Sequence, residues 1–177
     1  MAAASTLPGW PASGRGRLGP ALAAGAAGMA LNSALLALAD AVHQPTGHGG
    51  LLKLLLLLSA GTRSVVPGPL FRTGFHIAIG LGMALIYAWL VEPRWPGRVC
   101  SKALGCAAGV WLLNAGVILP LTGAGFAGHD RLDLAGMLWF AFAHTMFFLT
   151  TAVVYARGPT WSASPRPAPE TATAPRR

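Results

Sequence analysis

The chain has 177 residues, of which 54% are hydrophobic and only 10% are charged, and its mean hydropathy is +0.55. An average soluble domain has about 25% charged residues, so a water-soluble globule is excluded and an integral membrane protein is expected. The formal net charge is +8, but the basic residues are scattered and form no stripe or stacking platform, so nucleic acid is not an expected partner.

The two ends of the chain differ in composition from its middle. Residues 1–19 are rich in Gly, Pro, Ser and Ala and show no apolar period. Residues 158–177 carry five prolines among Ser, Thr and Ala. Proline at this density interrupts helices and strands, so we predict disordered tails over 1–19 and 158–177 and one transmembrane domain over 20–157.

Four apolar stretches in that domain run over 20–41, 72–91, 99–121 and 134–156. Each has about the 20 residues that a helix needs to cross a hydrocarbon core about 30 Å thick. None alternates polar and apolar residues, as the strands of a membrane barrel do. The sequence therefore predicts an all-α fold, an integral membrane four-helix bundle.

A fifth apolar run, 51–60, lies between the first and second stretches. It has ten residues, includes Lys53 and is flanked by glycines, so it is too short to span a membrane. Five consecutive leucines disfavour a solvated loop. We predict a short interfacial helix, with Lys53 directed toward the lipid headgroups.

The first stretch also has features of a signal peptide, since Arg15 and Arg17 precede it and Ala37-Leu38-Ala39 mimics a cleavage site. Its apolar run exceeds the usual length of about 7–15 residues, so we predict an uncleaved span. Cleavage would instead leave a protein with three spans.

The distribution of Lys and Arg predicts the orientation of the spans. With the N-terminus inside, nine basic residues lie inside and four lie outside; the outer four are Lys53, Arg63, Arg72 and Arg131. Cytoplasmic loops of membrane proteins carry an excess of basic residues. We therefore expect a multi-pass protein of the cell inner (plasma) membrane with both termini in the cytoplasm.

Small residues predict where helices approach each other or a partner. Gly25 and Gly28 give the first span a smooth face, and small-xxx-small pairs occur at 78/82 and 105/109. In lipid, close backbone approach is a main source of helix association. These faces suit contacts within the bundle, self-association or contacts with other membrane proteins, although Ala and Gly are so common here that such pairs also arise by chance.

Polar residues inside the spans are the candidate site, because a buried polar group in lipid is costly. The cluster comprises Asn32, Asp40, His76, Asn114 and His144. At a rise of about 1.5 Å per residue, all of them fall near the midplane or in the outer half of the bilayer. We expect one connected cluster or a cavity open to the outside, in which His144 bonds to Asn32 or Asn114.

Three interpretations of this cluster remain open. The preferred one is structural: amides and imidazoles bond across helices, and no cofactor is bound. In the second, His76 and His144 hold a haem, or bind a divalent metal together with Asp40, His43 and His129. An estimated difference in depth of about 7 Å between His76 and His144 disfavours haem. The third is a proton path, which the inner halves of the spans would leave incomplete.

The remaining polar loops and motifs offer no catalytic constellation. His129, Asp130 and Asp133 resemble a weak metal-ligand cluster, but Asp133 is also well placed as the N-cap of the fourth span. We find no serine with an activating base, no paired intramembrane carboxylates and no zinc-protease motif. We therefore expect no enzyme activity and an accessory or structural role in the membrane.

Short motifs resemble a group of small uncharacterised bacterial membrane proteins with four spans. Residues 75–80 (Phe-His-Ile-Ala-Ile-Gly), followed by Tyr87, resemble the second span of that group, and the glycine-rich run 120–128 resembles the end of its third span. His144 stands where the fourth span of that group often carries histidine, but Phe148 replaces the glycine that usually follows. The resemblance implies a four-span protein of a bacterial inner membrane and no particular activity.

Overall fold

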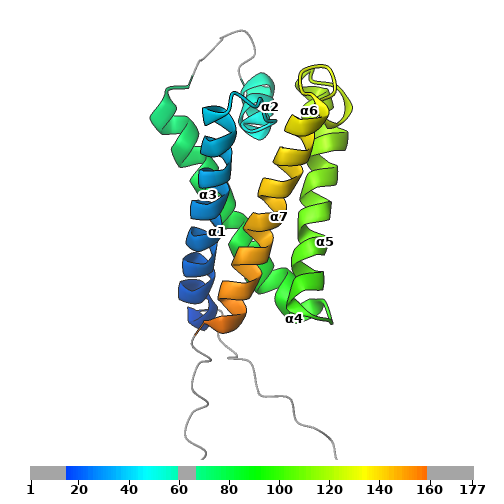
Figure 1. Ribbon diagram of the computed structural model, residues 1–177. Helices are drawn as coiled ribbons and strands as arrows, with labels where there is room; N and C mark the ends of the chain where they lie inside the picture. Colours follow the sequence, from blue (N-terminus) through cyan, green and yellow to red (C-terminus); the bar gives the residue numbers. More distant parts are fainter. Residues whose placement is uncertain (1–14, 60–66, 159–177) are drawn as a thin grey trace, which may run out of the picture.

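The computed structural model describes residues 15–59 and 67–158 of the chain (Figure 1). Within these ranges the protein is helical and contains no strand, which confirms the predicted all-α fold. Four helical segments, Arg17–Ala41, Pro69–Arg94, Val99–Leu121 and Leu134–Arg157, are long and apolar enough to cross a membrane. The predicted tails lie outside the described residues, except for 15–19 and Gly158.

The helical elements follow the predicted order. They are α1 (Arg15–Ala41), α2 (Gly50–Ser59), α3 (Pro69–Ile86), η1 (Tyr87–Val91), α4 (Glu92–Arg94), α5 (Val99–Leu113), η2 (Asn114–Ile118), α6 (Leu119–Leu121), η3 (Phe126–Gly128) and α7 (Leu134–Arg157). Helix α2 has ten residues, which corresponds to a length of about 15 Å, so the segment between the first two spans is a helix too short to span.

Two predicted boundaries were wrong. Helix α1 begins at Arg15, inside the predicted tail, because Pro20 lies near the helix start and removes only one intrahelical hydrogen bond there. The second span runs from Pro69 to Arg94 rather than over 72–91. Pro69 occupies the first helical position, where its fixed φ and missing N–H are compatible with a helix start.

Two π-helical turns, η1 and η2, each lie just before a proline, Pro93 and Pro120. The ring of a proline within a helix clashes with the carbonyl four residues earlier, and a wider turn relieves this clash. Pro93 also leaves the carbonyl of Trp89 without its helical donor, and Arg94 Nη1 donates to that carbonyl at 2.7 Å. The spans therefore continue through both prolines.

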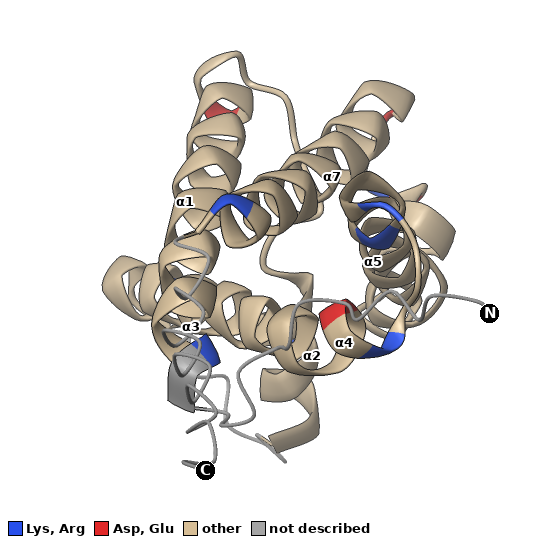
Figure 2. Ribbon diagram, turned by 90° about the horizontal axis from the view of Figure 1, so that it is seen from below, with Lys and Arg blue, Asp and Glu red and all other residues tan. Residues whose placement is uncertain are grey.

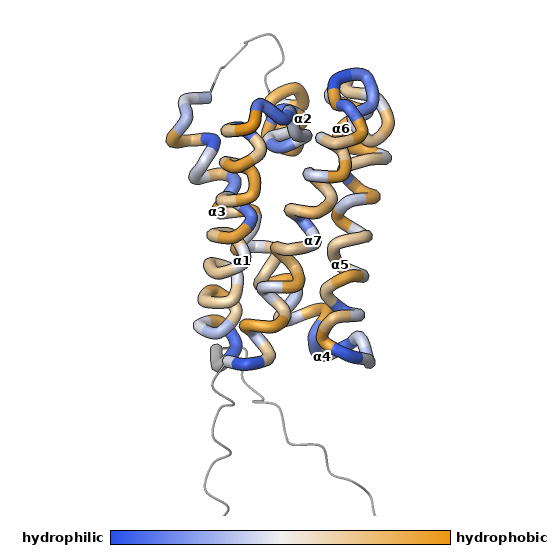
Figure 3. Tube along the Cα trace, in the orientation of Figure 1, coloured by the Kyte–Doolittle hydropathy of each residue, from blue (hydrophilic) through white to orange (hydrophobic). Residues whose placement is uncertain are grey.

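The spans form an antiparallel bundle with an unequal set of contacts (Figures 1 and 2). Helix α1 packs against α3 and α7, and α7 packs against α5, whereas α3 and α5 do not pack closely along their length. The start of α1 and the end of α7 lie at one end of the bundle, and α2 lies at the other (Figure 1). Apolar residues dominate the spans, and hydrophilic residues gather at the two ends (Figure 3).

The glycines of α1 allow close packing against α3 and α7, as we predicted from the small residues of the first span. A Cβ at Gly28 would meet Thr151 Oγ1 and Phe147 O, and a Cβ at Gly25 would lie 2.6 Å from Ala84 Cβ. By contrast, a Cβ at Gly82 or Gly109 would have no neighbour within 4 Å. The 78/82 and 105/109 pairs therefore do not hold the described helices together through these two glycines.

The half of the bundle near the termini is filled by a hydrophobic core. Its buried residues are Met29, Tyr87, Ala103, Ala107, Phe147, Phe148 and Ala152. Beside this core, Lys102 Nζ lies 3.0 Å from Glu92 Oε1 and also donates to the Glu92 carbonyl, while Tyr87 Oη donates to Glu92 Oε2. The side chains of Lys102 and Glu92 are only 9% and 14% exposed, so this ion pair joins the second and third spans in a largely buried setting.

Candidate functional site

A cavity of about 1040 Å³ occupies the other half of the bundle. Residues of α1, α3, α5, η2 and α7 line it, and residues 47–53 together with Leu56 and Leu57 line the end at α2. Its deepest lining residues include Met29, Met83 and Phe147, which belong to or border the core just described. The cavity is thus bounded on the side of the termini by packed side chains.

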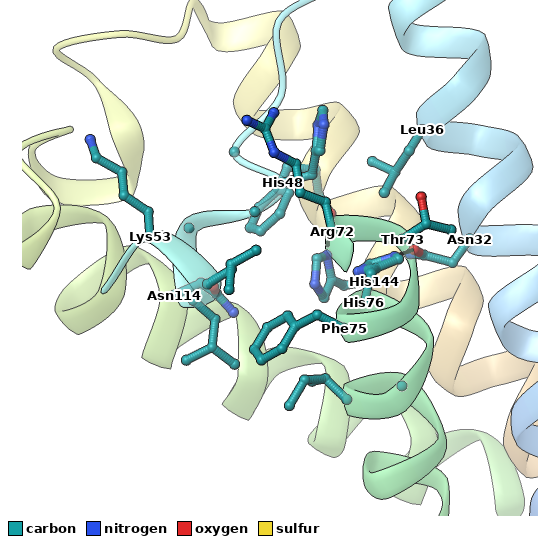
Figure 4. A pocket seen from close by; sticks show the side chains of 18 of the residues that line it. Asn32, Leu36, His48, Lys53, Arg72, Thr73, Phe75, His76, Asn114 and His144 are labelled. Atoms are coloured by element: carbon teal, nitrogen blue, oxygen red, sulfur yellow. Dashed lines mark hydrogen bonds between the residues drawn. The ribbon is translucent and has the colours of Figure 1, made fainter. Parts of the chain in front are cut away.

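Three helices are joined by hydrogen bonds at one wall of this cavity (Figure 4). Asn32 of α1 is 3% exposed, and its Nδ2 donates to the Ala143 carbonyl of α7 at 3.0 Å. His76 Nε2 of α3 donates to Asn32 Oδ1, also at 3.0 Å. The amide of Asn32 therefore satisfies both of its ends inside the bundle and links α3 to α7.

His144 lines the same cavity, but its bonding partner differs from the one predicted. Its Nδ1 donates to the Phe140 carbonyl of its own helix at 2.9 Å, and the two rings lie 4.3 Å apart. The prediction that His144 bonds to Asn32 or Asn114 was wrong. A carbonyl one helical turn away lies within reach of an imidazole whatever the neighbouring helices do, so the local bond is formed.

These bonds determine which ring nitrogens carry protons. The acceptors are an amide oxygen and a carbonyl, so His76 must donate through Nε2 and His144 through Nδ1. In the neutral rings, His76 Nδ1 and His144 Nε2 are then acceptors. Neither atom bonds to a described residue, and both residues line the cavity. The cavity wall thus offers two unused imidazole acceptors.

Asn114 and Asp40 line the cavity without joining this network. Asn114 is 8% exposed and its Nδ2 donates to Val110 O within its own span, at the start of the π turn η2. Asp40 is exposed at the end of α1. The predicted cluster is therefore one cavity lined by all five residues, of which only Asn32 and His76 share a hydrogen bond.

The mouth of the cavity carries cationic groups. Arg72 lies one helical turn before His76, and its Nε donates to Pro67 O at 3.0 Å. Lys53 of α2 donates to the Thr122 carbonyl at 2.7 Å, which ties α2 to the end of the third span. His48 Nδ1 lies 2.7 Å from Thr46 Oγ1. Figure 4 shows His48 and Arg72 together at one end of the cavity, above His76 and His144.

The metal ligands considered from the sequence are not gathered by the fold. In the part of the chain that the structure describes, no three His, Cys, Asp or Glu residues are close enough to hold a metal ion. His129 instead pairs with Asp130 at 2.9 Å on an exposed loop. The predicted N-cap role of Asp133 is confirmed, since its Oδ1 accepts from Gly136 N and from Gln44 Nε2, both at 2.7 Å.

His76 lies beside Asn32, although the sequence predicted that the two differ in depth. Sequence counting placed His76 well to the outer side of Asn32 and His144, but His76 bonds directly to Asn32. The oblique course of α3 across the bundle accounts for this, because the distance along a tilted helix overstates the depth of a residue (Figure 1).

Sequence reasoning missed the part that the mouth plays. Arg72 was considered only as a charge in the orientation count, and Lys53 only in that count and as a contact to lipid headgroups. The spacing of Arg72 and His76, four residues apart, places both on one face of α3 and was a usable signal. That residues 47–53 reach the same cavity as His144 depends on tertiary packing and has no signal in the sequence.

Comparisons with known proteins identify no relative. No protein-family model matches the chain, and no match was found among curated proteins or among solved structures.

Proposed function

We propose that this integral membrane protein has a non-catalytic, accessory role and holds a membrane-resident amphiphile in the cavity. The observation that carries the proposal is the combination of apolar walls with a few convergent polar groups in one concave space of about 1040 Å³. A purely structural cluster would need Asn32 and its partners, but it would not need a cavity beside them.

The unequal packing of the two halves of the bundle argues against a conduction path. The core around Tyr87, Phe147 and Phe148 fills the half of the bundle near the termini, so the cavity ends inside the protein. A cavity that is closed on this side does not connect the two ends of the bundle. This supports the accessory role over a proton path.

The proposed setting is the inner (plasma) membrane, with both termini cytoplasmic and the cavity in the outer half. Basic residues near the start of α1, at the end of α7 and around the turn between the second and third spans include Arg17, Arg94, Arg98, Lys102 and Arg157. The positive-inside rule supports this orientation. A bacterial source follows only from the resemblance and stays a prediction.

Ligand retention tests the proposal. The full chain is purified in mild detergent, and co-purified small molecules are identified by native mass spectrometry. Ile79 lines the cavity, whereas Ile77 on the same helix is 41% exposed and does not line it. Ile79→Trp should reduce the retained amphiphile several-fold, and Ile77→Trp should leave it unchanged. Equal retention by both variants would contradict the proposal.

A cofactor or ion bound through His76 and His144 is the second candidate. The observation in its favour is the orientation of His144: a histidine ligand commonly donates one ring N–H to a carbonyl and uses the other nitrogen for the metal. The absorption spectrum and the metal content of the purified protein test it. A Soret band or stoichiometric metal, lost in His144→Leu, would favour this candidate over the amphiphile.

A further inference from the structure

The polar groups of the cavity lie at two levels, and each level requires a different ligand chemistry. At the mouth is the guanidinium of Arg72. One helical turn deeper are the unused acceptors His76 Nδ1 and His144 Nε2. Below them the lining is apolar, with Met29, Met83 and Phe147 among its members. A ligand that fits all three levels carries, in this order along its length, an anionic group, a hydrogen-bond donor and an apolar chain.

Arg72 makes the mouth suitable for an anion. Its Nε bond to Pro67 O holds the guanidinium at the rim, and its terminal amino groups bond to no described residue. The start of α3 beside it has no side-chain cap, and the positive end of its helix dipole adds to the charge of Arg72. Lys53 also lines the cavity, but its Nζ donates to the Thr122 carbonyl and points away from Arg72 in Figure 4, and Asp40 lies at the end of α1. Arg72 is therefore the group at the mouth that can contact an anion.

The deeper level requires a hydrogen-bond donor. Two neutral imidazoles whose protons are already committed to Asn32 and Phe140 can only accept. A plain acyl chain at this level would leave both acceptors unpaired in an apolar space, at a cost in free energy. A hydroxyl placed just below the acidic head can donate to one of these two acceptors.

We propose that the cavity binds a lysophospholipid with an acidic headgroup. Its phosphate lies at Arg72, the free hydroxyl of its glycerol donates to His144 or His76, and its single acyl chain extends toward Met83 and Phe147. This assignment rests on the proposed function and names its ligand. A diacyl phospholipid has no free hydroxyl on its backbone glycerol, between phosphate and chains, and a fatty acid lacks both that hydroxyl and the phosphate.

Three probes separate the head, the hydroxyl and the chain. Native mass spectrometry of the full chain in a neutral detergent measures binding of oleoyl lysophosphatidic acid, its analogue without the glycerol hydroxyl, and oleoyl lysophosphatidylcholine. The wild-type protein should bind the first about tenfold more tightly than either of the others, which corresponds to one lost hydrogen bond or charge contact.

Matched variants assign each preference to its residue. Arg72→Gln should bind lysophosphatidic acid only as tightly as lysophosphatidylcholine. Arg131 is a basic residue outside the cavity, so Arg131→Gln should bind like the wild type. His144→Leu should lower affinity for lysophosphatidic acid to that for the analogue without hydroxyl, and leave the analogue unaffected. Unchanged elution volume and melting temperature establish that each variant is folded.

Several outcomes would overturn the inference. Equal binding of all three probes, equal loss in Arg72→Gln and Arg131→Gln, or displacement of lysophosphatidic acid by diacyl phosphatidic acid would each do so. Each of these leaves the proposed function standing if retention still falls in Ile79→Trp. Loss of both the probe binding and the Ile79→Trp effect would reject the proposed function as well.

Discussion

Asn32 is the residue whose side chain connects the most elements of the site. Its amide joins α3 to α7, whereas the amide of Asn114 bonds within its own span. Asn32→Leu should leave His76 Nε2 without its acceptor and remove the side-chain link to α7, and so lower the free energy of unfolding by about 1–2 kcal/mol. Asn114→Leu should cost less, because the carbonyl of Val110 keeps its helical environment. Unfolding in mixed micelles of increasing SDS content compares the two, and equal losses would contradict the network described.

Gly28 tests the close approach of α1 and α7. An added methyl would meet Thr151 Oγ1 and Phe147 O, so Gly28→Ala should destabilise the bundle by about 1–3 kcal/mol. Gly109→Ala is the matched control, because its methyl would meet nothing within 4 Å and alanine favours helix. Melting temperatures in one detergent report both. A control as damaging as the test variant would mean that α5 contacts a partner at Gly109, such as a second copy of the chain.

The sequence identified polar residues that line one cavity, but it did not predict their bonds. Polar residues within apolar spans are rare enough to be identified without a structure, and all five line one cavity. Their partners were not predictable in the same way. The bond of His144 to Phe140 is local and wins over longer-range alternatives, and the bond of His76 to Asn32 requires the tilt of α3.

Among the elements, the turn between the second and third spans depends on a buried ion pair. Lys102→Met would leave the Glu92 carboxylate with Tyr87 as its remaining described partner and should lower the free energy of unfolding by about 3 kcal/mol. Adding Glu92→Gln should restore part of this loss, since the unpaired charge is removed. A double-mutant cycle in detergent measures the coupling. Strictly additive effects would show that the pair contributes nothing.

Helix α2 should lie along the membrane surface at the end of the bundle away from the termini. Its ten residues cannot cross the bilayer, and Lys53 ties it to Thr122. In a background without the free cysteines Cys100 and Cys106, single cysteines at positions 47 and 68 should react with an impermeant thiol reagent from the same side. Reaction from opposite sides would show that α2 spans.

The sequence predicted the number and order of these elements because span length is set by the thickness of a bilayer and leaves a clear apolar signal. It predicted element ends less well where prolines are involved. Pro20, Pro69 and Pro93 all lie inside helical segments, near a terminus or beside a π turn that accommodates the ring. In a sequence, proline usually indicates the end of a helix, but a helix tolerates it in its first turn or beside a π turn.

The whole molecule has two unlike halves, one packed and one hollow, and the orientation decides which faces the cytoplasm. The excess of basic residues predicts that the packed half is the cytoplasmic one. Reporter fusions at positions 97 and 177 should be active only in the cytoplasm, and fusions at 66 and 127 only outside. An outside C-terminal reporter would support the cleaved, three-span alternative.

The division into a packed and a hollow half could not be predicted from composition, because both halves of each span are apolar. It arises from the tilt of α3, which approaches α1 but leaves α5 without a close neighbour on that side (Figures 1 and 2). In a bilayer such a space must hold lipid, water or a ligand.

The space beside His76 and His144 should hold an amphiphile in the membrane. Electron microscopy of the full chain in a lipid nanodisc tests this. We predict elongated density that starts near Arg72, passes the two histidines and ends at Phe147, with α3 and α5 still apart. A cavity that has closed, with α3 packed against α5 and no density between them, would contradict the account.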